Sequence, residues 1–547
     1  MPGRLLENLR HKTALAALAG FGAALAFHLA EVAQGIGHTL EGPHDFRQAQ
    51  TAITTYYLQR DGLKIDYETP VFGSPASIPF EFPTYQFAVA GLHRLLGGRL
   101  DVAGRLTSIA FFYATLPLIV LTLRRLQLPW TAIWLGLATL LVSPVYIFYT
   151  RAFLIESTAL FTSWAFLLAL SVLLFRDPPA PGSATEVRVR RILTVIAVAA
   201  GILAAVTKIT TFAIHAAGAV WLALAFHREH LLRWRHDAGA RRRVRTSLLT
   251  LTGVLAGVLL VAIAWTHHTD VVKLRNPSPI VHRLTSAGLA GWNFGHPGQW
   301  LQPGTWRGLY DHFLSASVAS FFPVGLALVF LLMIRGHRPV ITALLLAFLT
   351  GPAVFMNLFF VHDYYWYANT VFFSLACGVT VGTFLLEFLA NSGATRLLVV
   401  TVFIVAQAAA YHYSGYHLLQ RAPPQETGRL AEMVRQHTGE AGSIVVFGFD
   451  WNSMLPYYSE RRAFMVPWDS ELFFERGSQQ AIRNMAAAGH PVDAVVFGGA
   501  AASDASLQNR ALACLPGRFV HAYHLDGTLI LAREPAPAGE PAPPSPP

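Results

Sequence analysis

Charged residues are scarce in this chain of 547 residues. Asp, Glu, Lys and Arg together make up 13% of it, whereas hydrophobic residues make up 53%. Soluble domains carry about a quarter charged residues, so most of this chain does not face water. The apolar residues also come in long blocks, which is typical of a membrane protein rather than of one large soluble core.

Cysteine is nearly absent too, which excludes a disulfide framework. Cys377 lies inside an apolar block and Cys514 in the polar C-terminal part, so we do not expect the two to meet. The net charge of +10 could indicate a nucleic-acid partner. The arginines lie between apolar blocks, however, where the positive-inside rule explains them, and no nucleic-acid binding is expected.

About eleven apolar runs are long enough to cross a bilayer, at roughly 20 residues each. The first follows Arg4, Arg10 and Lys12 and resembles a signal peptide. Because many more runs follow, we interpret it as an uncleaved first span. The predicted spans lie near 13–33, 102–123, 129–147, 154–175, 191–208, 210–226, 246–266, 314–334, 338–358, 367–389 and 396–412.

Basic residues mark every second loop, which predicts the orientation. The cytoplasmic side would hold the N-terminus, Arg124–Arg125, Arg176–Arg191, Arg228–Arg245, Arg335–Arg338 and Arg396. The other side would hold a first loop (about 34–101), a middle loop (about 267–313), a short aromatic loop (about 359–366) and everything from about 413. We therefore expect a multi-pass protein of the bacterial inner (plasma) membrane, with a cytoplasmic N-terminus and a periplasmic C-terminal domain.

The chain is predicted to form a transmembrane part (1–412), a small soluble α/β domain (413–534) and a disordered Pro-rich tail (535–547). In the soluble domain, strands at 443–449, 494–497 and 528–532 alternate with helices at 426–437 and 479–488. In the first loop, helices are expected over 45–58 and 83–96.

A first candidate site is HDFRQAQTA, residues 44–52. Asp45 could act as general base on an acceptor hydroxyl, with a pKa raised by partial burial. His44 and Arg47 beside it would contact substrate. Asp45 could equally cap the helix that follows, because Asp is a favoured N-cap residue, and the two roles are compatible.

Two further motifs carry charge at span ends. In YTRAFLIES (149–157), Glu156 and Arg151 could form a structural ion pair. Alternatively, Glu156 faces the same cavity mouth as Asp45, and Arg151 contacts substrate. In TKITT (207–211), Lys208 could snorkel to the interface or stabilise the charge on a departing lipid phosphate.

The remaining candidates lie in the middle and aromatic loops. Lys273, Arg275 and Arg283 could complete a phosphate clamp or be merely solvated. A metal site at the adjacent His267 and His268 is not expected, because neighbouring side chains diverge. In VHDYYWYAN (361–369), the aromatic residues fit the interfacial belt. The residues that could contact a sugar or a phosphate there are His362, Asp363, Tyr364 and Tyr365.

Together these motifs, with FEFPTYQF (80–87) and GRLDVAGRLTS (98–108), resemble the GT-C superfamily of membrane glycosyltransferases. The branch is similar to bacterial relatives of protein O-mannosyltransferases and of the lipid A aminoarabinose transferase. The resemblance covers about 13–412 and implies an inverting transfer from a polyprenyl-phosphate sugar outside the cytoplasm. It matches Asp45 to the first-loop catalytic acid, Glu156 to a second acidic position and Lys208 to a TKG-like motif. The chain departs from the family in having isoleucine after Lys208 and Glu at a frequent Asp position.

The resulting prediction is a polytopic α-helical GT-C-like protein with a C-terminal α/β domain. Its partners would be a polyprenyl-phosphate-sugar donor, the lipid bilayer and an extracytoplasmic glycolipid, polysaccharide or protein acceptor. No cofactor is predicted, although distant relatives use a divalent ion. The loop GFDWNSMLPYYSERR (448–462) follows a strand, where α/β folds often bind ligands, but it could equally pack against the membrane part. A transporter or lipid flippase is the main alternative function, and an assembly protein that binds partners through its soluble domain is a third.

Overall fold

The structure is a computed structural model that describes residues 2–40, 42, 44–175, 184–389, 391–421 and 427–533. Contacts between residues divide the chain into two compact units, which are described separately. The helical unit comprises Met1–Gly42, Glu81–His267 and Leu289–Pro423. The sheet unit comprises Pro43–Phe80, His268–Gly288 and Pro424–Pro547.

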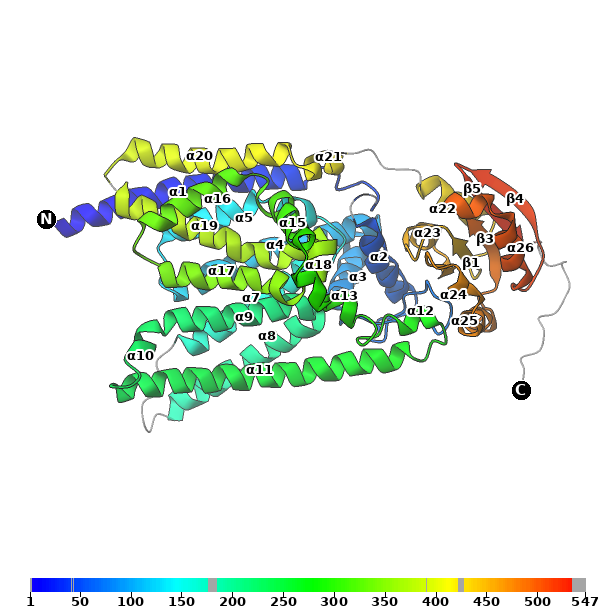
Figure 1. The fold of residues 1–547 in the computed structure, drawn as a ribbon, viewed down its shortest axis with the longest axis horizontal. Coiled ribbons are helices and arrows are strands. Elements are labelled where there is room, and N and C mark those ends of the chain that lie inside the picture. Colours follow the sequence, from blue (N-terminus) through cyan, green and yellow to red (C-terminus); the bar gives the residue numbers. More distant parts are fainter. Residues whose placement is uncertain are drawn as a thin grey trace. The chain divides into compact units, whose positions relative to one another are not determined.

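The chain is a multi-pass helical membrane protein, as predicted. Within the described residues, eight helices are long and apolar enough to cross a membrane. They are α1 (Pro2–Val32), α4 (Leu100–Arg125), α7 (Glu156–Leu174), α8 (Ala184–Thr207), α9 (Ile209–Phe226), α11 (Ala238–Lys273), α19 (Trp366–Phe388) and α20 (Gly393–His412) (Figure 1).

The other three of the eleven predicted spans form shorter or bent helices. The run at 129–147 is divided by Pro144 into α5 (Trp130–Leu141) and α6 (Pro144–Tyr149), and α17 (Arg338–Val354) has 17 residues. Near 314–334, α15 (Pro303–His312) and the π-helix η1 (Phe313–Val318) join α16 (Phe321–Met333) at a bend of 92°. Counting that bent pair as one span gives nine candidates in the described part of the chain.

Helix α19 is the most enclosed of the candidate spans, with 83% of its apolar window buried. It packs against α5 and α17. Small residues permit the contact with α5, because a Cβ atom added to Gly378 would lie 2.1 Å from the backbone nitrogen of Gly136. Close backbone approach through small residues is a usual means of packing helices in membranes, and a side chain at Gly378 would force α5 and α19 apart.

Short helices connect the long ones within the helical unit. They are α3 (Thr84–Leu96), α10 (Arg228–Leu232), α13 (Ala290–Phe294), α14 (Pro297–Trp300), α18 (Met356–Val361), the 3-10 turn η2 (Asp363–Tyr365) and α21 (Gly415–Arg421). One connection is shorter still: Lys208 alone separates α8 from α9, with an extended backbone (φ −162°, ψ 101°).

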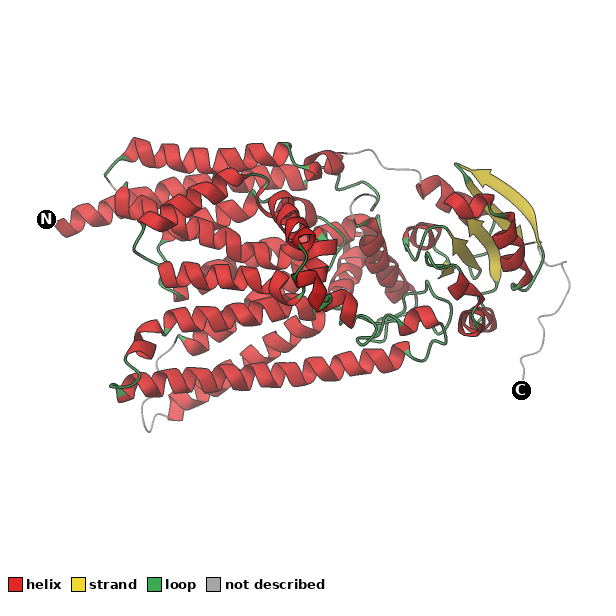
Figure 2. Cartoon of the chain, viewed as in Figure 1, coloured by secondary structure: helices red, strands yellow, loops and turns green. Residues whose placement is uncertain are grey.

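The sheet unit is built on a mixed five-stranded sheet of order β2-β1-β3-β5-β4. Its strands are the yellow arrows in Figure 2. The strands are β1 (Ser443–Phe447), β2 (Arg462–Met465), β3 (Val492–Phe497), β4 (Phe519–Leu525) and β5 (Thr528–Arg533). Strands β2, β1 and β3 are parallel, whereas β5 is antiparallel to β3 and β4. The predicted α/β domain is confirmed, with three strands at the expected positions and β2 and β4 in addition.

Helices complete the sheet unit. They are α2 (Asp45–Arg60), α12 (Pro279–His282), α22 (Thr427–Gln436), α23 (Met454–Ser459), α24 (Glu471–Phe474), α25 (Arg476–Ala487), the 3-10 turn η3 (Gly499–Ser503) and α26 (Ala505–Ala513). The predicted tail at 535–547 lies outside the described residues.

The first loop contributes an extended segment to the edge of this sheet. Backbone nitrogens of Ala463 and Met465 on β2 donate to the carbonyls of Pro70 and Val71, each over 2.8 Å. From the middle loop, Asn276 donates its amide to the carbonyl of Pro75 at 2.8 Å. Residues 43–80 and 268–288 are therefore structural parts of the unit that the sequence prediction began at residue 413.

Candidate functional site

Two of the predicted charged residues meet in the helical unit. Glu156 is the first residue of α7, where a carboxylate is favoured by the helix dipole, and its Oε1 accepts a short charge-assisted hydrogen bond from Nζ of Lys208. Both residues are buried, with 2% and 6% of their surface exposed. Lys208 therefore does not snorkel to the surface, and Glu156 pairs with Lys208 rather than with Arg151.

The aromatic loop covers this pair. Nζ of Lys208 lies 4.6 Å from the ring centroid of Tyr365 and 5.3 Å from that of Tyr364. The two tyrosines stack on each other at 4.6 Å, and His362 packs on Tyr364 at 5.2 Å. Three of the predicted motifs, YTRAFLIES, TKITT and VHDYYWYAN, thus converge in one cluster, which we call the Lys208 cluster.

Asp363, at the start of the same turn, is held by two tyrosines. The hydroxyl of Tyr149 on α6 donates to its Oδ1 at 2.7 Å, and the hydroxyl of Tyr416 on α21 donates to its Oδ2 in a short hydrogen bond. Burial, followed by the nearby Tyr416 and Asp363, raises the pKa of the Tyr149 hydroxyl well above its ordinary value. Both phenols consequently stay protonated as donors, and the Asp363 carboxylate, which accepts from both, fixes the aromatic loop.

Arg151 is a buried cation with no carboxylate partner among the described residues. It is 7% exposed, donates weakly to the carbonyl of Gly35 at 3.2 Å, and its Nε has no hydrogen-bond partner. Its guanidinium lies over the ring of Phe148 at 5.5 Å. Burial, and then the neighbouring Arg105, lowers the pKa of Arg151 to about 9, which leaves it charged at neutral pH.

Arg105 differs from Arg151 in the number of carbonyl groups to which its terminal nitrogens donate, although the Nε atom of each makes no hydrogen bond with a described residue. Its guanidinium donates to the carbonyls of Gly35, Ile36, His38 and Thr39 over 2.7–2.9 Å. It thereby folds the segment that follows α1 back onto α4. Arg151 shares only one of these carbonyls, so its charge is the less compensated of the two.

Aromatic contacts link Arg151 to the Lys208 cluster. Phe148, under the Arg151 guanidinium, packs on Tyr416 at 5.2 Å, and Tyr416 holds Asp363. Tyr149 lies 6.3 Å from Tyr364, ring to ring. The helical unit therefore contains a continuous group of two cations, two carboxylates and several phenols at the ends of α6, α8 and α18.

The first-loop residues lie in the sheet unit. Asp45 is the first residue of α2, and the N-cap position is taken by His44, whose backbone is left-handed (φ 55°) and whose side chain makes no capping hydrogen bond. The carboxylate of Asp45 is half-buried and accepts from the amide of Asn452 at 3.4 Å. The prediction that Asp45 caps this helix is therefore wrong by one residue, because His44 is at the N-cap position and Asp45 is the first residue of the helix.

Two cations flank one aromatic ring in the sheet unit. The Arg47 guanidinium lies 5.9 Å from the ring centroid of Phe80, and Nζ of Lys273 lies 4.5 Å from it. Lys273 is buried, with an ion pair to Asp270 at 3.7 Å. Arg275 and Arg283 are exposed, and the structure shows no hydrogen bond or ion pair from either side chain to a described residue.

The loop 448–462 packs on α2 within the sheet unit. Trp451 meets the ring of Phe46 edge-on at 4.3 Å, and the amide of Asn452 reaches Asp45. At its far end, Arg462 forms ion pairs with Asp61 at 2.7 Å and Glu68 at 2.6 Å. The sequence left open whether this loop binds a ligand or packs against the membrane part. In the structure it packs against residues of the first loop, and ligand binding by the loop stays a prediction.

Sequence reasoning missed several partners of the site. Tyr149 stood inside a quoted motif, so its position beside Glu156 was a usable signal. Tyr416 and Asn452 carry no local signal, because each becomes relevant only through a contact with a residue 53 or more positions away.

No protein-family model matches the chain, and no curated protein matches its sequence. Solved structures do match. ArnT from Cupriavidus metallidurans bound to undecaprenyl phosphate has a TM-score of 0.55 at 14% identity, covering 94% of this chain and 97% of that one. The archaeal oligosaccharyltransferase AglB from Archaeoglobus fulgidus, in complex with an inhibitory peptide and a dolichol-phosphate, has a TM-score of 0.55 at 12% identity, covering 88% and 69%.

The arabinofuranosyltransferase AftD from Mycobacteria matches with a TM-score of 0.51 at 15% identity, covering 96% of this chain and 40% of that one. The similarity is therefore to GT-C membrane glycosyltransferases over most of the chain. At these identities it is a likeness of fold, as expected from the motifs.

Proposed function

We propose that the protein is an inverting glycosyltransferase that moves a sugar from a polyprenyl-phosphate-linked donor to an acceptor outside the cytoplasm. Two structures of similar fold hold a polyprenyl phosphate, undecaprenyl phosphate in one and a dolichol-phosphate in the other. The observation that carries the proposal for this chain is Arg151, a buried guanidinium without a carboxylate partner in the described structure.

A buried charge is costly unless it is paired. Lys208 and Glu156 meet that requirement together, whereas Arg151 has a single weak hydrogen bond to a carbonyl. A bound phosphate would supply the missing negative charge, and a planar guanidinium matches phosphate oxygens in a bidentate way. We therefore assign Arg151 to the donor phosphate together with Lys208. The assignment of the exposed Arg275 and Arg283 to a phosphate clamp remains a prediction from the sequence alone.

The reaction divides between a base and these cations. Asp45 takes the proton of the acceptor hydroxyl as that oxygen bonds to the anomeric carbon of the sugar. The bond between the anomeric carbon and the phosphate oxygen breaks at the opposite face, and both of its electrons stay on the polyprenyl phosphate. Attack from the opposite face inverts the anomeric centre. The cations stabilise the charge that develops on the leaving oxygen.

The other residues position these groups. Glu156 is the second acidic residue and orients Lys208, with which it is paired. His362, Tyr364 and Tyr365 contact the sugar, since stacked phenols offer it an apolar face, and Asp363 fixes that loop through Tyr149 and Tyr416. His44 and Arg47 contact substrate beside Asp45.

The acceptor is a glycolipid, a polysaccharide or a protein hydroxyl. We place the reaction at the periplasmic face of a bacterial inner membrane, with the N-terminus in the cytoplasm, because the basic loops alternate with the long loops along the sequence.

Transfer from purified, reconstituted protein tests the proposal. Incubation with a series of polyprenyl-phosphate sugars is expected to release free polyprenyl phosphate, and Arg151→Gln is expected to reduce that release at least about 100-fold. Arg396→Gln is the matched control, because Arg396 is another buried arginine of the helical unit, 5% exposed. Equal activity of the two variants would contradict the role of Arg151.

A second pair of variants tests the base. Asp45→Asn keeps the size of the side chain and is expected to abolish transfer while the protein stays folded. Asp469→Asn, at an exposed carboxylate of the same unit, is expected to leave transfer unchanged. Full activity of Asp45→Asn would refute the assignment of the base.

A further inference from the structure

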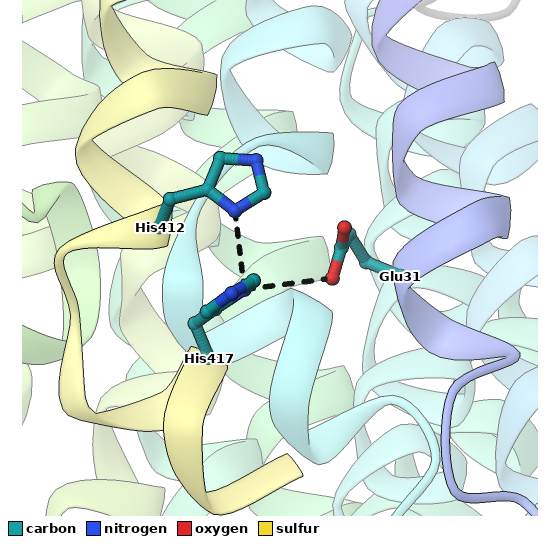
Figure 3. A group of neighbouring side chains, drawn as sticks. All are labelled: Glu31, His412 and His417. Atoms are coloured by element: carbon teal, nitrogen blue, oxygen red, sulfur yellow. Dashed lines mark hydrogen bonds and ion pairs between the residues drawn. The ribbon is translucent and has the colours of Figure 1, made fainter. Parts of the chain in front are cut away.

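The end of α1 meets the corner between α20 and α21 in the helical unit, and three potential metal ligands converge there. Figure 3 shows Glu31 from α1 facing His412, the last residue of α20, and His417 on α21. Nδ1 of His412 lies 3.2 Å from Nδ1 of His417, which lies 3.9 Å from Oε2 of Glu31. Their ligand atoms all lie within 4.8 Å of one another.

These separations suit a tetrahedral metal ion. Zinc binds imidazole nitrogen and carboxylate oxygen at about 2.0–2.1 Å, which places neighbouring ligand atoms about 3.3 Å apart. Two imidazoles and one carboxylate form a donor set that zinc and its neighbours in the first transition row accept. Two ring nitrogens 3.2 Å apart can share only one proton between them, whereas a metal ion would bind a lone pair of each.

The ligands are held in place by contacts that do not involve a metal. The amide of Gln420 donates to the backbone carbonyl of Glu31, and the hydroxyl of Tyr411 donates to Oε1 of Gln420 at 2.7 Å. Both Tyr411 and Gln420 are completely buried. Glu31 is only 7% exposed, and the charge partners of its carboxylate in the described structure are Arg421 and His417.

Arg421 currently supplies the positive charge at this corner. Its Nη2 forms an ion pair with Oε2 of Glu31 at 3.1 Å. Its Nη1 makes a short hydrogen bond with Nδ1 of His417 and lies 3.0 Å from Nε2 of the same ring, so a metal ion would have to displace Arg421 from this ligand atom. The side chain is 38% exposed, whereas that of Glu31 is 9% exposed. Arg421 can therefore turn into solvent and give up its position to a smaller cation without leaving an unpaired buried charge of its own.

We propose that Glu31, His412 and His417 bind a divalent transition metal of the zinc class, which displaces the Arg421 side chain and clips α1 to α21. No step of the glycosyl transfer described above uses these residues. The clip would nevertheless affect the loop of the Lys208 cluster, because Tyr416 precedes His417 on α21 and donates to Asp363. A filled site is thus a positioning device for the aromatic loop.

Metal titration of the full chain in detergent tests the proposal. The protein is purified without a polyhistidine tag, stripped with a chelator and titrated with Zn²⁺ by calorimetry and with Co²⁺ by visible absorption. One Co²⁺ is expected to give tetrahedral absorption bands that Zn²⁺ abolishes. His417→Gln and Glu31→Gln are expected to weaken Zn²⁺ binding at least about tenfold, whereas His521→Gln, at an exposed histidine of β4, is expected to change nothing.

Arg421→Ala separates a metal site from a simple ion pair. If Arg421 competes with the metal, its removal should tighten Zn²⁺ binding about tenfold, because a like charge is taken away from the ligands. The proposal is overturned if Arg421→Ala binds Zn²⁺ no more tightly than the unaltered protein. It is also overturned if the Co²⁺ bands persist in His417→Gln or never form. These readouts do not depend on transferase activity. The proposed glycosyl transfer could therefore be refuted while the metal site is confirmed, and the metal site could be refuted while glycosyl transfer is confirmed.

Discussion

The buried pair of Lys208 and Glu156 gives the most quantitative prediction of the account. Both side chains are almost completely enclosed, at 7% and 2% exposure, and each is the other's charge partner. Removal of one partner leaves an uncompensated charge in a buried site, which costs about 3–5 kcal/mol. We therefore expect Glu156→Gln and Lys208→Met each to lower the free energy of unfolding by about that amount.

The loss of unfolding free energy in the double variant should be smaller than the sum of the losses in the two single variants. With both charges gone, the desolvation cost disappears as well, and replacement of a buried pair by neutral residues of similar size is often close to neutral. We expect the double variant to be less destabilised than the more damaged single variant. This requires a coupling energy larger than the smaller of the two single losses, that is, more than about 3 kcal/mol, which is above the usual range for contacting residues. Transfer activity should stay lost, because the cation assigned to the donor phosphate is absent.

Unfolding in mixed micelles of increasing SDS content, followed by tryptophan fluorescence, measures these energies. Arg396→Gln reports the cost of losing another buried charge of the helical unit. Losses that add in the double variant would refute the reasoning, since they would mean that Lys208 and Glu156 contribute independently. Recovery of activity in the double variant would refute the functional role of Lys208 while leaving the structural one intact.

Three further outcomes follow from contacts in the two units. Tyr149→Phe and Tyr416→Phe each remove a donor from the Asp363 carboxylate, so each should cost about 1.5–3 kcal/mol in the same unfolding assay; a change below about 0.5 kcal/mol in both would show that Asp363 is not anchored by these phenols. Trp451→Ala should lower the free energy of unfolding by about 2 kcal/mol, less than the loss of about 3–5 kcal/mol typical of a fully buried tryptophan. It should also increase amide hydrogen exchange in residues 45–60. Unchanged exchange there would contradict the packing of loop 448–462 on α2. Burial raises the pKa of Glu68, but hydrogen bonds and charges from Lys64 and Arg462 outweigh it, so that the pKa is lowered from 4.5. The pair with Arg462 therefore stabilises above about pH 4.5 and is lost as the pH falls through the lowered pKa. Glu68→Gln should reduce stability at pH 7 and flatten this acid-side loss, and a variant whose stability matches that of the unaltered protein at pH 7 would contradict it.

Long apolar runs made the helical part predictable. All eleven expected spans fall on helices, because a helix that faces lipid must be apolar along most of its length. The exceptions are local. Pro144 ends the predicted run at 129–147 early, and the left-handed Ala319 (φ 55°) lies in the bend of 92° between η1 and α16. The hydropathy of an apolar run predicts neither the end of a helix before a proline nor a bend at a left-handed residue.

In the sheet unit, the sequence predicts several individual strands but not which residues of the chain belong to the unit. Strand β1 and most of β3 are completely buried and therefore form apolar runs in the sequence. Strand β4 has only exposed and half-buried residues and includes two histidines, so it lacks that signal. The addition of 43–80 to the sheet unit depends on backbone hydrogen bonds between Pro70–Val71 and β2. Such bonds are made by any residue type, and the sequence therefore holds no trace of them.

For the site, sequence reasoning found the charges but not their pairing. Glu156 and Lys208 were named as candidates, yet the expected alternative partner of Glu156 was Arg151, five residues away. Instead, Lys208, the single residue between α8 and α9, pairs with Glu156, and the charge nearest to Arg151 is that of Arg105. Pairing over 52 positions is a property of helix packing, which one sequence does not reveal.

Transfer of a labelled sugar from a polyprenyl-phosphate donor tests the central claim most directly. Unaltered protein in liposomes should convert the donor to free polyprenyl phosphate in equal amount to glycosylated acceptor, and the new bond should have the inverted anomeric configuration. Asp45→Asn and Arg151→Gln should give neither product. The account would be contradicted if the labelled donor crossed the bilayer intact and no acceptor were glycosylated, since that result is expected of a flippase.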